Sequence, residues 1–264
     1  MRMSHVQHKR ALCKLAAILT LCAGLCTSAG EPPTALAGFC PAPAAAQTAT
    51  ASDALIAEST AFAPIELIRQ NPALPNGCEV TSLAMVLTAA GYPAGHVDLY
   101  NNHLPQEDIT EENGERHSAS PEDAYIGDAA AAPGGWYCFE QPILQAGNSW
   151  IAENGGDARM QNLRGIDHES LLAYAAAEIP VICWVTLDYA TPNYFLDYTW
   201  MLPDGSEYTP YSNLHCVVVT GMENGFFRIA DPLNGWQFVK KDVFWQSFAA
   251  MGQRAVAVVP SAAE

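Results

Sequence analysis

The sequence predicts an α+β fold, in which a helical N-terminal part packs on a C-terminal antiparallel sheet. The clearest helical periodicity lies early, in residues 79–93, and the strand-like apolar runs lie late, in residues 181–260. A turn signal, Glu223-Asn224-Gly225, joins two of the late runs as in a β-hairpin. Helices followed by strands, with no internal repeat, favour an α+β arrangement.

The segment EVTSLAMVLTAAGYP, residues 79–93, has the strongest helical pattern. Its apolar side chains recur at i, i+3, i+4 and i+7, namely at Val80, Leu83, Ala84 and Leu87. Gly91 at its end and Pro93 just beyond it form a stop signal. Asn76 and Gly77, shortly before the segment, can cap its start. The sequence therefore predicts a helix with a defined beginning and end.

The remaining elements follow in order along the chain. Residues 101–135 are polar, acidic and interrupted by Gly and Pro, which predicts a long surface loop of a kind that is often functional. Two shorter helices are predicted, over 142–155 and over 167–178 with Asp167 as the cap. Another helix is expected over 241–252. Strands are expected at 181–187, 215–222, 226–232, 235–241 and 254–260.

Composition limits the possible classes of function. Hydrophobic residues make up 50% of the 264 positions, so the chain can bury a sizeable core as one large domain or two small ones. It has 12 basic and 28 acidic residues, a formal net charge of -16. Such a surface repels phosphate backbones and anionic lipid, so no nucleic-acid partner is expected. The acidity is explained either by solubility outside the cell or by a preference for cationic substrates.

The N-terminus resembles a targeting segment. Residues 1–29 combine a basic, acid-free start, an apolar stretch and small residues, the order of a secretory signal peptide. The apolar stretch is shorter than the ~20 residues that a membrane-spanning helix needs, although an uncleaved anchor remains the alternative. We therefore expect a secreted or cell-surface protein with no stable membrane insertion after signal cleavage. Residues 30–60, rich in Ala, Pro, Ser and Thr, predict a linker, which leaves 61–264 as the folded domain.

Four of the eight cysteines lie in the predicted domain. They are Cys78, Cys138, Cys183 and Cys216, and none forms a C-x-x-C pair, so neither a metal nor another cofactor is predicted. Cys183 and Cys216 fall in strand-like runs, where buried free thiols are common. The state of Cys138 stays open.

Cys78 is placed where a thiol can become a nucleophile. The thiolate is the reactive form, and a free cysteine with a pKa near ~8.5 is mostly protonated at neutral pH. A helix start provides partial positive charge and unpaired N–H groups, which favour a thiolate and can also hold an oxyanion. Position alone leaves a second interpretation equally open, in which Cys78 is one more small buried residue.

His215 supports the catalytic interpretation. It lies within an apolar strand run, whereas the other histidines of the domain fall in polar loops or beside a helix cap: His96, His103, His117 and His168. A lone strand histidine is usually a core residue satisfied by hydrogen bonds. Here the next predicted strand carries Asp231, and Asn234 follows shortly after it. Either side chain can orient an imidazole, as the third member of a Cys–His–Asp or Cys–His–Asn set.

The hairpin register decides between these two residues. With a three-residue loop Met222 pairs with Phe226, and Asp231 lies on the same face as His215. With a two-residue turn His215 lies opposite Asn234 instead. A β-bulge would reverse the outcome in either case, so the register stays open.

Several segments resemble a known family. QNPALPNGCEVTSLAMVLTAAGY closely resembles the nucleophile segment of the stand-alone relatives of the bacteriocin-processing (double-glycine leader) cysteine peptidases, which are papain-like. HCVVVTGMENGFFRIADPLNG resembles the segment that carries their His and Asp. DAYIGD and the run from Asn162 to Leu187 resemble the segments between. The similarity covers roughly residues 62–260.

The resemblance implies a role for each matching residue. Cys78 would be the nucleophile and His215 the general base and acid, with Asp231 rather than Asn234 orienting the imidazole. Gln70, eight residues before Cys78, would be the side-chain oxyanion donor. Glu79 follows the nucleophile as in these relatives, and the sequence assigns it only the electrostatics of a helix start. The chain shows no transporter domain, so removal of leader peptides during export is not the expected task.

These observations predict a secreted papain-like cysteine peptidase that acts on a peptide or protein. A cell-wall amidase or a transamidase could use the same residues. A non-catalytic exported binding domain is the third possibility, with the aromatic stretch 189–200 (YATPNYFLDYTW) lining a cleft rather than packing as a hairpin. The sequence gives no prediction of oligomeric state.

Overall fold

A six-stranded sheet forms the centre of the structure. The computed structural model describes residues 59–131 and 133–260; the predicted signal peptide, 1–29, and nearly all of the predicted linker, 30–60, lie outside the described residues. The strands are ordered β11-β10-β9-β6-β12-β5, and each neighbouring pair is antiparallel. They are β5 (Ala158–Asn162), β6 (Val181–Thr186), β9 (Leu214–Glu223), β10 (Phe226–Asp231), β11 (Gly235–Lys240) and β12 (Ala255–Pro260). The five strands expected from the sequence are confirmed, and β5 is an addition to them.

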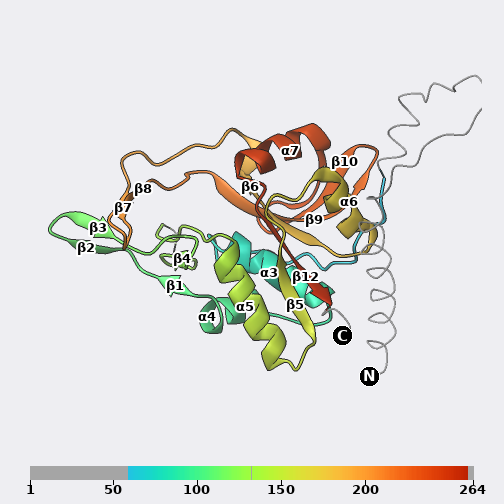
Figure 1. The fold of residues 1–264 in the computed structure, drawn as a ribbon, viewed down its shortest axis with the longest axis horizontal. Helices are drawn as coiled ribbons and strands as arrows, with labels where there is room; N and C mark the ends of the chain where they lie inside the picture. Colours follow the sequence, from blue (N-terminus) through green and yellow to red (C-terminus); the bar gives the residue numbers. More distant parts are fainter. Residues whose placement is uncertain (1–58, 132, 261–264) are drawn as a thin grey trace, which may run out of the picture.

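Helices cover both faces of this sheet in the described part of the chain (Figure 1). On one face lie α3 (Cys78–Ala89), α4 (His96–Asn102) and α5 (Glu140–Glu153), and on the other α6 (His168–Ala176) and α7 (Lys241–Ala250). A short 3₁₀ helix, η1 (Leu187–Tyr189), follows β6. The four predicted helices are confirmed with ends shifted by a few residues. The Asp167 carboxylate caps α6 by accepting from the Ser170 N–H, as predicted. The α+β class is therefore correct.

The prediction of a long loop over 101–135 is wrong. This region contains α4's end and the short strands β1 (Gln106–Glu107), β2 (Thr110–Glu112), β3 (Glu115–His117) and β4 (Tyr125–Ile126). Strands β2 and β3 join β7 (Trp200–Met201) and β8 (Glu207–Tyr208) in a second sheet that projects from the body (Figure 1). Asn113 and Gly114 both have positive φ in the tight turn between β2 and β3. The residues of β2 and β3, on either side of this turn, are mostly charged and none of them is buried. No apolar periodicity therefore marks these two strands in the sequence.

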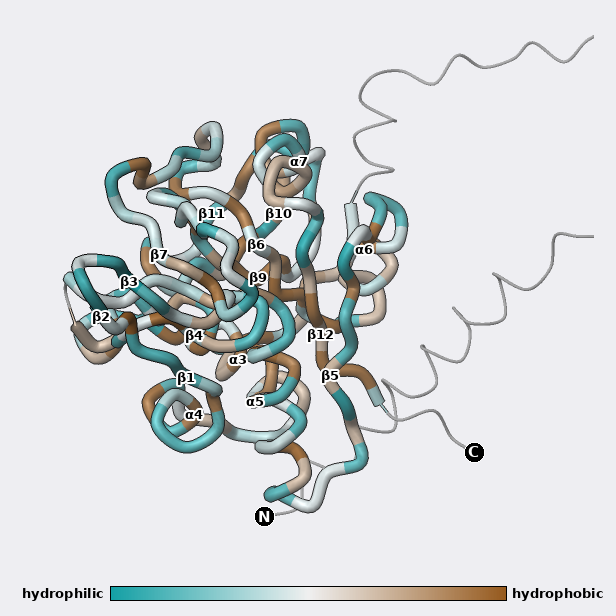
Figure 2. The backbone as a smooth tube through the Cα atoms, turned by 60° about the vertical axis from the view of Figure 1, so that its left-hand side comes forward, coloured by the Kyte–Doolittle hydropathy of each residue, from teal (hydrophilic) through white to brown (hydrophobic). Residues whose placement is uncertain are grey.

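The main sheet is hydrophobic on both faces. In β6, Ile182 and Trp184 join the core cluster with α3, while Val181, Cys183 and Val185 join the cluster with α7. Figure 2 shows the hydrophobic colouring concentrated on the central strands. A strand covered on both sides has no polar face, which explains its continuous apolar sequence.

Helix α3 lies between the sheet and α5 and is buried on nearly every side. Its first ten residues, from Cys78 to Leu87, are all buried, including Glu79. Gly77 is the N-cap residue, and a Cβ there would lie 2.7 Å from the Leu74 Cβ, so only glycine fits this turn. The Asn76 side chain does not cap the helix, because it donates to the Ala131 carbonyl (2.6 Å). The tight turn and the buried helix fix the position of Cys78.

Candidate active site

Cys78 is the first residue of α3 and is 7% exposed. The partial positive charge of a helix start lies at its position. Its thiol donates a hydrogen bond to Glu79 Oε2 (3.3 Å), the carboxylate of the next residue. The backbone N–H of Cys216, the residue after His215, also faces the sulfur. The nucleophile predicted from the sequence therefore lies beside the strand that carries the predicted base.

The electrostatic environment of Cys78 differs from the expectation. The sequence suggests a thiol whose pKa is lowered by its place at a helix start. In the structure burial raises the pKa of Cys78 well above its ordinary value, and the charge and hydrogen bond of Glu79 raise it further. The Cys216 N–H acts in the opposite direction but is outweighed. The arrangement shown thus contains a neutral thiol.

His215 and Asp231 form a buried pair. His215 Nε2 lies 2.9 Å from Asp231 Oδ1, and both side chains are almost fully buried. This contact leaves Nδ1 as the ring nitrogen that can exchange a proton with a thiol. Burial opposes ionisation of Asp231, but the hydrogen bond and charge of His215 and nearby backbone N–H groups lower its pKa. An ionised Asp231 stabilises an imidazolium at His215.

Asn234 supports Asp231 rather than the imidazole. Its Nδ2 donates to Asp231 Oδ2 (3.0 Å), and its backbone N–H donates to Oδ1 (3.0 Å). The Leu233 N–H (2.7 Å) and Gln237 Nε2 (3.2 Å) are further donors to the same carboxylate. Of the two candidates left open by the sequence, Asp231 contacts His215.

A β-bulge produces this geometry. The turn has two residues, Asn224 and Gly225, both with positive φ, and Glu223 pairs with Phe226. The pairing of Met222 with Phe226 is therefore wrong, and by itself this turn would place His215 opposite Asn234. Between Arg228 and Ile229 the register shifts by one residue, with Thr220 as the extra residue of β9. The shift returns His215 and Asp231 to the same face.

Gln70 connects the start of α3 to the Asp231 loop. Its backbone N–H donates to the Pro232 carbonyl (3.0 Å), and its Nε2 donates to the Pro75 carbonyl (2.5 Å). The side chain is 3% exposed, and Oε1 is buried without a hydrogen-bond partner in the described part of the chain. One Nε2 hydrogen is engaged by Pro75, which leaves the second for another acceptor.

Glu79 is the site residue whose importance the sequence did not reveal. It is completely buried, and its two oxygens accept from Cys78 Sγ and from the Cys138 N–H, each at 3.3 Å. Burial raises the pKa of Glu79 to about 7, against its hydrogen bonds, which lower it. The available signal was a carboxylate inside a run of otherwise uncharged, buried helix residues.

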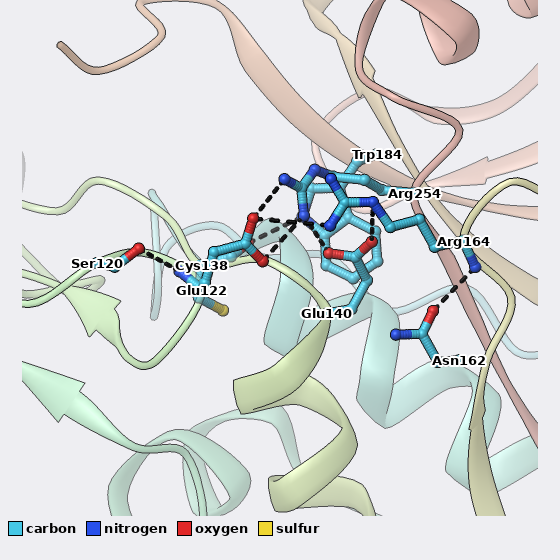
Figure 3. Close-up of polar contacts among 8 residues, drawn as sticks. All are labelled: Ser120, Glu122, Cys138, Glu140, Asn162, Arg164, Trp184 and Arg254. Carbon is cyan, nitrogen blue, oxygen red and sulfur yellow. Dashed lines mark hydrogen bonds and ion pairs between the residues drawn. The ribbon is translucent and has the colours of Figure 1, made fainter. Parts of the chain in front are cut away.

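A charged network holds the segment that contacts Glu79 (Figure 3). Arg254 bridges Glu122 (2.5 Å) and Glu140, and its guanidinium lies 3.6 Å from the centre of the Phe139 ring. Trp184 Nε1 donates to the Cys138 carbonyl (2.9 Å). Both sides of the Cys138 backbone are therefore held in place, by Glu79 and by Trp184.

The remaining cysteines form no disulfide. Cys78, Cys138, Cys183 and Cys216 are all free and buried, which confirms the prediction for Cys183 and Cys216 and answers the question left open for Cys138. Within residues 59–131 and 133–260 no group of three or more His, Cys, Asp or Glu side chains could hold a metal ion. The same residues include no helix long and apolar enough to cross a membrane.

Replacing Asp231 by asparagine should reduce the peptide hydrolysis expected from the sequence by about 100-fold or more. The amide would lose the charge that stabilises an imidazolium. It would also direct its NH₂ either at His215 or at the donors of Asn234 and Gln237. The measurement is kcat/KM on one peptide substrate, with Asp204→Asn, an exposed acid, as the control. Unchanged kcat/KM in a folded Asp231→Asn protein would exclude this role.

The combination of a central helix that begins at a cysteine with a sheet that carries a His–Asp pair is that of the papain-like cysteine peptidase fold. A family model described as "Peptidase_C39 like family" matches residues 62–256, and the chain belongs to this family. It is 32% identical over 202 residues to the uncharacterized protein YvpB of Bacillus subtilis (strain 168), covering 74% of this chain and 75% of that protein.

Two solved structures were also found to be similar to this chain. A presumed C39-like peptidase from Bacillus anthracis superimposes with a TM-score of 0.66 at 26% identity, covering 78% of this chain and 100% of that one. A double-glycine-motif protease of an AMS/PCAT transporter, solved with its leader peptide, gives a TM-score of 0.41 at 16% identity. That match covers 76% of this chain and 95% of that one.

Proposed function

We propose that this protein is an exported cysteine peptidase that hydrolyses peptide bonds with Cys78 as its nucleophile. The observation that carries the proposal is the buried pair of His215 on β9 and Asp231 on β10, together with the Cys216 N–H of β9, which faces the Cys78 sulfur. Membership of a peptidase family supports the same reaction class. Export is inferred from the basic and then apolar composition of residues 1–29.

The reaction would proceed through an acyl-enzyme. His215 takes the proton of Cys78 as sulfur attacks the carbonyl carbon, and the electron pair of the C=O bond moves to oxygen. The free Nε2 hydrogen of Gln70 and the Cys78 backbone N–H would stabilise that oxyanion. His215 then protonates the leaving amine, and water releases the acyl group by the reverse sequence. Asp231 keeps the imidazole oriented throughout.

Selective alkylation tests the nucleophile. At mildly acidic pH, an iodoacetamide probe should label Cys78 at least about tenfold faster than Cys138, Cys183 or Cys216, because the proposed transfer of its proton to His215 would provide a thiolate where ordinary thiols stay protonated. The three other cysteines are buried free thiols in the same molecule and serve as internal controls. Mass spectrometry of tryptic peptides gives the rate at each position.

Equal labelling of all four cysteines would count against an activated nucleophile. Digestion of a peptide library beside purified peptidoglycan then identifies the bond that is cleaved. Release of peptides from the library supports a peptidase, whereas cleavage confined to peptidoglycan would replace it by a cell-wall amidase with the same site.

A further inference from the structure

Glu79 occupies a position that its place in the sequence does not explain. An acid in the first turn of a helix normally stabilises the helix start from the surface. The Glu79 side chain is instead completely buried, and it bridges Cys78 Sγ and the Cys138 N–H. A carboxylate is costly to bury without a cation, so its burial in contact with the proposed nucleophile points to a chemical role.

Within the part of the chain that the structure describes, the ionisable groups that act on Glu79 or respond to its charge do not neutralise it. Its charge raises the pKa of ionisable side chains on α3, β4, β9 and the segment before α5, all of them acids that are uncharged near neutral pH: Cys78, Tyr125, Cys216 and Cys138. Burial is the larger cause for each of them. A thiolate at Cys78 and a carboxylate at Glu79 would thus be two like charges in direct contact inside the protein.

The hydrogen bond from Cys138 favours one oxygen of Glu79 as the site of a proton. Oε1 accepts from the Cys138 N–H, so a proton on Glu79 belongs on Oε2, the oxygen 3.3 Å from the sulfur. The Cys138 backbone is fixed by Trp184, and the adjoining Phe139 ring is covered by Arg254. Protonated Glu79 is therefore aimed at Cys78 as a hydrogen-bond donor.

We propose that Glu79 is a catalytic residue that acts in its protonated form, donating a hydrogen bond from Oε2 to the Cys78 thiolate. This role rests on the proposed peptidase function. When Glu79 is ionised, the Cys78 thiol donates to it, and formation of the thiolate is opposed by the neighbouring charge. When Glu79 is protonated, the same contact stabilises the thiolate that His215 generates.

The proton of Glu79 takes no part in the bond changes. The proton of Cys78 moves to His215, the S–C bond forms, and His215 delivers that proton to the leaving amine as the C–N bond breaks. Glu79 only donates and withdraws a hydrogen bond. Because its pKa lies at about 7, the proposed site loses its donor as the pH rises through neutrality.

Glu79→Gln isolates this effect. Its Oε1 can still accept from the Cys138 N–H, and its Nε2 takes the place of the protonated Oε2 but cannot ionise. The rate of Cys78 alkylation by iodoacetamide should fall roughly tenfold between pH 6 and pH 8 in the unaltered protein. In Glu79→Gln it should stay within about twofold over the same range. Glu153→Gln, at an exposed position of α5, is the matched control and should follow the unaltered protein.

The outcomes separate the two proposals. Parallel pH profiles for Glu79→Gln and the unaltered protein, with Cys78 selectively labelled in both, would overturn the role of Glu79 and leave the peptidase proposal standing. Labelling of Cys78 no faster than Cys183 in either protein at any pH would overturn the peptidase proposal itself, and the role of Glu79 with it.

A measurement on the unaltered protein covers the case in which Glu79→Gln does not fold. Infrared spectroscopy should show the C=O band of a buried, protonated carboxyl at pH 6 that disappears by pH 8, in step with the fall in Cys78 alkylation. A protein without such a band at pH 6 would contradict the proposal.

Discussion

Replacing Cys78 by alanine should reduce kcat for peptide hydrolysis by about 10⁶-fold, the order of magnitude found when a serine peptidase loses its covalent nucleophile. Gln70 and the Cys78 backbone N–H could still hold an oxyanion, but no acyl-enzyme could form. The fold should be retained, because the change removes one sulfur from a side chain that is already nearly buried. Steady-state hydrolysis and a thermal melt on the same preparation test both statements.

Cys183→Ala is the matched control for this experiment. Cys183 is also a buried free thiol, but it lies in the core cluster on the α7 side of the sheet, away from the cluster that contains Cys78. Its loss should leave kcat/KM within about threefold. If Cys78→Ala instead keeps the protein's full biological effect, the chain is a binding domain that retains a peptidase fold.

Replacing Arg254 by methionine should lower the free energy of unfolding by about 3–5 kcal/mol at pH 7, the typical cost of breaking a buried ion pair from one side. Arg254 is the close cationic partner of Glu140, which is 2% exposed. Arg164 also approaches Glu140, at 3.9 Å, but its side chain is half exposed. Methionine retains an apolar stem near Phe139. The decrease in the free energy of unfolding should therefore come mainly from the carboxylate of Glu140, which loses its close cationic partner.

The double variant Arg254→Met/Glu140→Gln separates charge from packing. Removing both charges should restore a large part of the lost stability, because the buried carboxylate is then gone. Urea unfolding at pH 7 gives all the values. A loss below about 1 kcal/mol for Arg254→Met would show that the network in Figure 3 is solvated well enough to tolerate an unpaired Glu140.

Most strands and helices of the main layers, though not β5 or α4, could be predicted because each has a pattern contained within its own segment. The apolar runs of β6 and β9 and the spacing in α3 are examples. The hairpin formed by β9 and β10 could not be predicted fully from the patterns of its separate strands. Neither proposed register is fully correct: the turn has two residues, but the extra Thr220 restores the facing that a three-residue loop would have given. A bulge depends on contacts across strands, which a single strand's sequence does not contain.

The candidate site was predictable in parts for the same reason. A helix start identifies Cys78 and a strand identifies His215, whereas only the family resemblance favours Asp231 over Asn234 and assigns Gln70 a role. Glu79 was recognised as adjacent to Cys78, but its burial depends on the Cys138 segment, which lies about 60 residues away in the sequence. The pairing of Arg254 with Glu122 and Glu140 spans still longer separations. No local pattern marks such contacts.

The bulge at Thr220 also limits how this hairpin can change during evolution. Side chains alternate between the faces of a strand, so the loss or gain of one residue between His215 and the turn would move His215 to the opposite face from Asp231. We therefore expect insertions and deletions between these two residues to be tolerated in pairs, or singly when a bulge is gained or lost at the same time. Whether the number of residues between His215 and Asp231 is odd or even should therefore be constrained as strongly as the identity of those residues.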